Sequence, residues 1–148
     1  MDIVEAIKAR RSVRSYTGRA LSSDESRQLT AAISNVYDPF GADDVTISLV
    51  HFDDNGTVRP STYGVIKGAS DFLLMGMGSS DLTALSAGFR MEQVVLMATQ
   101  MGLGTCWIAA TFDGTKFSKV IDLPEGETLK IISPVGEPGG KTRLLERI

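Results

Sequence analysis

Apolar residues recur at helical spacing in four stretches of this chain, and residues typical of helix ends bound them. Asp2 precedes the first stretch, and the capping-box pattern Ser22-Ser23-Asp24-Glu25 opens the second. Gly102 follows the third and longest stretch, where it can act as a C-terminal cap. The spacing therefore predicts helices over residues 3–9, 23–36, 81–101 and 114–121.

Four other stretches have the pattern of β-strands. Residues 45–52 alternate between apolar and polar side chains, which is typical of a strand with one buried face. Residues 71–78, 105–109 and 129–135 are short apolar runs bounded by turn residues. Because helices and strands follow one another without repeated strand–helix–strand units, the sequence predicts an α+β fold. We expect a mainly antiparallel central sheet flanked by helices.

Composition and charge limit the classes of function. With 148 residues, 43% of them hydrophobic, residues 1–148 are expected to form a single domain with its own core. The net charge of −3 argues against nucleic-acid binding, which needs a broad basic surface. No apolar run approaches the ~20 residues of a membrane span, and the acidic N-terminus resembles no secretory signal, so we expect a cytoplasmic protein. One histidine and one cysteine make a metal site built from cysteine and histidine ligands implausible.

Three guanidiniums and a hydroxyl lie within five residues in the segment Arg10-Arg11-Ser12-Val13-Arg14. Like charges repel, so such a cluster is favoured where an anion sits among them, and an arginine fork matches two phosphate oxygens at once. For this motif alone, the alternative is a solvated basic turn. Two distant features favour phosphate: the glycine-rich segment Gly102-Leu103-Gly104-Thr105-Cys106-Trp107 and a basic tail that carries Lys141 and Arg143.

The spacing within the arginine cluster also predicts how its side chains point. In an extended segment, alternate side chains project to the same side. Arg10, Ser12 and Arg14 are thus expected to face one way and Arg11 the other, toward the edge of a bound ring or an acidic residue such as Glu92. If the basic tail converges on this segment, the two form one cationic pocket for a phosphate monoester.

Few residues of the chain are suited to acid, base or nucleophilic catalysis. The lone His51 has no Gly-x-Ser-x-Gly partner, and Gly102-x-Gly104 follows a helix and opens a strand, the reverse of a dinucleotide-binding motif. A protein with phosphate ligands but few catalytic groups often delegates its chemistry to a cofactor. A phosphate-bearing flavin fits, since residues 106–111 offer small side chains where backbone could approach a ring. The alternative for residues 106–111 is a core strand with small packing residues.

Five motifs occur along nearly the whole chain in a consistent order. They are Ala6-Ile7-x-x-Arg10-Arg11-Ser12-Val13-Arg14-x-Tyr16, Asp38-Pro39-Phe40-Gly41, Tyr63-Gly64-Val65-Ile66-Lys67-Gly68-Ala69, Gly102-Leu103-Gly104-Thr105-Cys106-Trp107-Ile108, and Ser133-Pro134-Val135-Gly136 with Lys141 and Arg143. In these motifs and their order, the chain resembles the nitroreductase family of FMN-dependent oxidoreductases.

The resemblance implies which positions would bind FMN. In a first segment, the phosphate, the ribityl chain and the ring edge would be held by Arg10, Arg11, Ser12 and Arg14. In a second segment, the flavin near N5 would be contacted by Ala109 and Ala110, and that strand end would be supported by Trp107 and Ile108. A third segment, with Lys141 and Arg143, would return to the phosphate.

The resemblance also implies an activity and an assembly. In such enzymes NAD(P)H reduces the flavin, and an acceptor such as a nitroaromatic or a quinone takes the electrons in a ping-pong cycle, so no catalytic protein side chain is expected. The family is normally homodimeric with FMN at the subunit interface. The helix over residues 81–101 is apolar nearly all round, which suits either an interface element or a central core helix.

Several features depart from the family pattern. The usual Ala-Pro-Ser-x-x-Asn-x-Gln-Pro-Trp stretch is missing, and the chain is shorter than the ~200 residues usual for such a domain. Ala109-Ala110 replaces a pair that is more often glycine, which would crowd the N5 side. Two alternatives therefore stand beside the enzyme: a non-catalytic flavin or small-anion binding protein on the same scaffold, and a fragment that needs a partner half.

Overall fold

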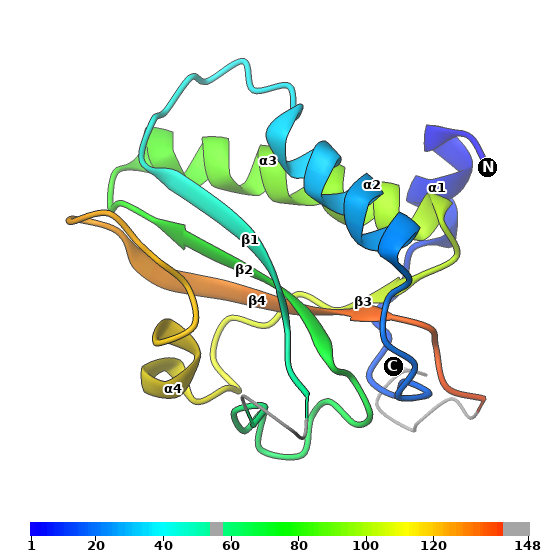
Figure 1. Cartoon of the computed structure of the whole chain (residues 1–148). Helices are drawn as coiled ribbons and strands as arrows, with labels where there is room; N and C mark the ends of the chain where they lie inside the picture. Colours follow the sequence, from blue (N-terminus) through cyan, green and yellow to red (C-terminus); the bar gives the residue numbers. More distant parts are fainter. Residues whose placement is uncertain (54–57, 141–148) are drawn as a thin grey trace.

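In the part of the chain that the structure describes, three helices lie on one side of a four-stranded sheet, and a short fourth helix lies on the other (Figure 1). The computed structural model describes residues 1–53 and 58–140. Along the chain, the elements are α1 (Ile3–Ala9), α2 (Ser23–Ser34), β1 (Val45–His51), β2 (Asp71–Met77), α3 (Asp81–Gln100), β3 (Gly104–Thr105), α4 (Gly114–Ser118) and β4 (Thr128–Gly136).

The sheet has the order β1-β2-β4-β3, and every neighbouring pair of strands is antiparallel. The predicted α+β fold with a mainly antiparallel central sheet flanked by helices is therefore confirmed. Phe72 and Leu74 of β2 pack in the same layer as Phe117 of α4, whereas Leu73 and Met75 pack in the layer of α3. Because successive side chains of a strand point to opposite faces, a strand covered on both faces is apolar throughout.

The ends of the helices follow the capping residues in the sequence. Asp2 and Glu5 form a capping box at α1, and Ser22 and Glu25 form one at α2. Helix α2 ends at Ser34, two residues before the predicted end. The next residue, Asn35, turns its side-chain amide back to the carbonyl of Ala31 at 2.8 Å and so closes the helix.

The predicted strand over residues 105–109 is wrong in its extent, because regular pairing stops after Thr105. The register of β3 and β4 places Cys106 opposite Pro134. Proline has no N–H to donate, so the ladder is interrupted there. The N–H of Cys106 donates to the Ser133 hydroxyl at 3.0 Å, and the chain rejoins β4 through the isolated bridge between Ile108 and Ile132.

Helix α3 has the role of a core helix, one of the two roles that its sequence allowed. One face is buried against the sheet and includes Met91, Val94 and Val95, each fully covered. On the other side, Leu82, Leu85 and Phe89 are 51%, 54% and 41% exposed. The helix is thus a core helix that also carries an uncovered apolar face.

Candidate functional site

The arginine segment 10–16 runs alongside β3, with isolated parallel bridges from Ser12 to Thr105 and from Ser15 to Lys67. The N–H of Val13 donates to the carbonyl of Thr105 at 2.8 Å. On the other side, the N–H of Tyr16 donates to the Lys67 carbonyl, and the N–H of Lys67 donates to the Arg14 carbonyl, each at 2.9 Å. The segment is therefore held between β3 and the loop 62–69, two regions distant from it in sequence.

A glycine allows the arginine segment to lie so close to β3. A Cβ atom at Gly104 would lie 2.8 Å from Cβ of Val13, closer than real Cβ contacts. Gly102, with a φ of +78°, ends α3 just before this contact. The glycine-rich motif and the arginine cluster are thus neighbours in the structure.

A cavity of about 170 Å³ lies where these two motifs meet. Arg10, Arg11, Gly104 and Pro138 are among the residues that line it. The Nη1 atom of Arg10 is buried and has no hydrogen-bond partner within residues 1–53 and 58–140. A buried guanidinium N–H without an acceptor costs free energy, which a bound anion would recover. The cavity is large enough for several water molecules, and two arginines line it, so its size and its positive charge suit a phosphate group.

The second predicted segment lies at the end of the interrupted strand. Trp107 is half-buried and donates from Nε1 to a carboxylate oxygen of Glu92 at 2.9 Å. Ile108 is buried, whereas Ala109 and Ala110 are exposed. Residues 107 and 108 are held by the hydrogen bond to Glu92 and by the bridge to Ile132. The small, exposed side chains of Ala109 and Ala110 directly after them leave the backbone accessible to a flat ligand.

The third predicted segment, Lys141 and Arg143, lies outside the described residues. The arm that leads to it, residues 136–140, lies directly beside the arginine segment. The N–H of Gly139 donates to the Ser15 carbonyl at 2.7 Å, and Pro138 forms an isolated bridge with Tyr16. The described part of the arm thus approaches the arginine segment, as the predicted convergence requires.

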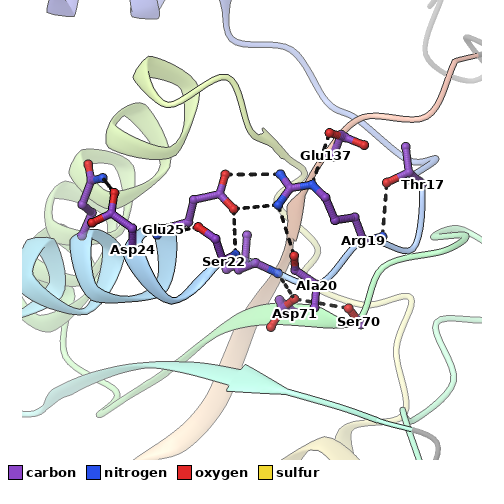
Figure 2. A network of polar contacts seen from close by, with 11 residues as sticks. Thr17, Arg19, Ala20, Ser22, Asp24, Glu25, Ser70, Asp71 and Glu137 are labelled. Carbon is purple, nitrogen blue, oxygen red and sulfur yellow. Dashed lines mark hydrogen bonds and ion pairs between the residues drawn. The ribbon is translucent and has the colours of Figure 1, made fainter.

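Sequence reasoning missed the polar network around Arg19, shown in Figure 2. Arg19 binds both carboxylate oxygens of Glu25 at the start of α2 and a carboxylate oxygen of Glu137 on the arm. The hydrogen bonds from Arg19 lower the pKa of Glu25 to about 2. The same bonds with Glu25 raise the pKa of Arg19. No local pattern could reveal this network, because Arg19 and Glu137 are 118 positions apart.

His51 lies at the end of the edge strand β1, and its Nδ1 lies 2.8 Å from a carboxylate oxygen of the buried Asp71. The other oxygen of Asp71 accepts from the N–H of Leu21. Within residues 1–53 and 58–140, no three histidine, cysteine, aspartate or glutamate side chains are grouped as a metal site. In the same residues, no helix is long and apolar enough to cross a membrane.

The fold is shared with solved nitroreductase structures. A nitroreductase family protein from Clostridium difficile 630 superposes with a TM-score of 0.75 at 18% identity, covering 99% of this chain and 90% of that one. A nitroreductase with bound FMN from Bacteroides fragilis gives 0.74 at 17% identity, with 97% and 92% covered. An FMN-dependent nitroreductase from Clostridium difficile R20291 gives 0.72 at 18% identity, with 96% and 93% covered. The chain therefore has the nitroreductase fold.

The family is shown by the sequence itself. Residues 2–146 match the family model described as "Putative TM nitroreductase". No curated protein matches the chain significantly. The chain belongs to this nitroreductase family, as its motifs predicted, and is an oxidoreductase in kind.

Proposed function

We propose that this protein is an FMN-dependent NAD(P)H oxidoreductase of nitroreductase type. The observation that carries the proposal is the cavity lined by Arg10 and Arg11, in a chain of the nitroreductase family. The Nη1 atom of the same Arg10 is buried and has no hydrogen-bond partner among the described residues. The FMN bound in the Bacteroides fragilis structure of the same fold supports it. When bound, FMN accepts a hydride from a nicotinamide and passes the electrons to an acceptor.

The residues of this chain bind and orient the cofactor. The phosphate, the ribityl chain and the ring edge would be held by the arginine cluster, which is Arg10, Arg11, Ser12 and Arg14. The basic tail that carries Lys141 and Arg143 would add to this contact. The backbone at Ala109 and Ala110 would lie against the ring, and the hydrogen bond from Trp107 to Glu92 would steady that strand end. The acceptor proposed is a nitroaromatic, a quinone or a similar compound, reduced in a ping-pong cycle.

The colour of the purified protein tests this function directly. We expect flavin absorption bands that bleach when NADH or NADPH is added without oxygen and return when a nitroaromatic or a quinone follows. Because Trp107 is the only tryptophan, FMN added to the apoprotein should also quench its fluorescence. A flavin that binds but is not bleached would favour the non-catalytic binding protein. Absence of any flavin binding would contradict both flavin-binding proposals, and would leave a small-anion binding protein or a fragment that needs a partner half.

We also propose a homodimer in which the exposed face of α3 is covered by the partner subunit. Leu82, Leu85 and Phe89 follow one another at helical spacing on this face, and the ring of Tyr37 packs edge-on against Phe89 while staying 69% exposed. An apolar surface of this kind marks an interaction site.

Sedimentation at micromolar concentration should give a dimer, and Leu85→Glu should shift the protein to a monomer. A monomeric wild-type protein would contradict the proposal.

A further inference from the structure

We propose that Arg19 is a positioning residue for the anion site: it ties the arm 136–140 to the start of α2, and so fixes the wall that Pro138 contributes to the cavity. The inference rests on the proposed function, since it concerns the site assigned there to FMN. It adds a residue that lies outside the arginine cluster and does not line the cavity.

The guanidinium of Arg19 is oriented by contacts from all three of its nitrogens (Figure 2). Nη1 and Nη2 donate to the two carboxylate oxygens of Glu25 at 2.9 and 3.3 Å, and Nε donates to Glu137 at 3.2 Å. Nη1 also donates to the Ala20 carbonyl at 3.2 Å. A bidentate contact such as that with Glu25 restricts the guanidinium to one orientation. Glu25 is itself held by the capping box with Ser22, so Arg19 links the arm to a rigid helix end.

The arm meets the cavity one residue beyond Glu137. Pro138 lines the cavity together with Arg10 and Arg11. The backbone of the arm is joined to the arginine segment by the bond from the N–H of Thr17 to the Glu137 carbonyl at 3.1 Å and by the contacts of residues 138 and 139 described above. Among the described residues, the pair of Arg19 and Glu137 is the ion pair that adds a side-chain tie to these backbone bonds.

The positive charge of Arg19 also favours anion binding in the cavity, as its contact with the arm does. Its guanidinium offsets the carboxylate of Glu137, which lies next in sequence to a residue of the anion cavity. Without Arg19, that carboxylate would lose its partner and would repel an incoming phosphate. Removing Arg19 therefore both loosens the arm and leaves an unpaired carboxylate beside the cavity, whereas removing Glu137 loosens the arm but takes that carboxylate away.

This difference defines the experiment, which compares Arg19→Met, Glu137→Ala and the double variant. Dissociation constants for FMN and riboflavin are measured with each apoprotein, together with its thermal midpoint. Arg19→Met should weaken FMN binding about two- to fivefold and leave riboflavin binding unchanged. Glu137→Ala should have a smaller effect, and the double variant should resemble Glu137→Ala, since the repelling carboxylate is then gone. A role in stability alone would not produce this rescue.

Arg27→Met is the matched control. Arg27 pairs with Asp24 on the same helix at 3.0 Å, but both side chains are mostly exposed and neither touches the arm. Its FMN affinity should equal that of the wild type. Unchanged FMN affinity in Arg19→Met, or equal losses for FMN and riboflavin, would overturn the positioning role while the wild type still binds FMN. A wild type that binds neither flavin would instead contradict the proposed function, and the inference with it.

Discussion

Replacing Gly68 with alanine is expected to lower the free energy of unfolding by about 3 kcal/mol. Gly68 has a φ of +82°, and a Cβ atom there would lie 2.3 Å from the carbonyl oxygen of Tyr16. The substitution therefore adds backbone strain to a collision with main-chain atoms, which cannot rotate away as a side chain could. The Tyr16 carbonyl belongs to the arginine segment, so the collision also disturbs the site. Urea unfolding followed by circular dichroism measures the change.

Gly64→Ala separates the two causes. Gly64 has nearly the same φ, +79°, but no atom lies within 4 Å of its would-be Cβ. This variant should therefore lose only the strain contribution, about 1–2 kcal/mol. If Gly64→Ala and Gly68→Ala lose equal stability, the packing of Gly68 against Tyr16 has no part in the effect.

Replacing Arg10 with alanine is expected to weaken FMN binding by one to two orders of magnitude. The variant removes one or more charge-assisted hydrogen bonds to a phosphate, each worth roughly 1.5–3 kcal/mol. Riboflavin lacks the phosphate, so its affinity should be nearly the same for both proteins. Paired titrations of FMN and riboflavin, followed by flavin fluorescence, measure the two losses.

Lys8→Ala provides the control for net charge. Lys8 lies two residues earlier on α1, is exposed, and carries the same charge as Arg10. Its loss should change FMN affinity far less, because an exposed charge in water acts weakly over distance. Equal weakening of FMN and riboflavin in Arg10→Ala would show that Arg10 does not contact the phosphate.

Short sequence motifs predicted many residues of the candidate site, but they did not predict how the structure brings these residues together. The arginine cluster and the glycine-rich segment each suggested an anion site, and the structure makes them neighbours through the bond between Val13 and Thr105. The burial of Arg10 Nη1, which has no hydrogen-bond partner among the described residues, could not be foreseen, because the burial of one atom depends on every element around it. The tie between Arg19 and Glu137 carried no local signal at all.

The sequence by itself determined the elements whose causes are local. Asp2 and Ser22 begin α1 and α2 because a capping side chain satisfies N–H groups within the first turn. The apolar run within β2 likewise predicted a buried strand. Only the tertiary structure decided where β3 stops, since the cause is Pro134 on the neighbouring strand. It also decided which face of α3 is buried and which stays exposed. Spacing along the chain reports contacts within an element, whereas contacts between distant residues depend on how the packed elements bring them together.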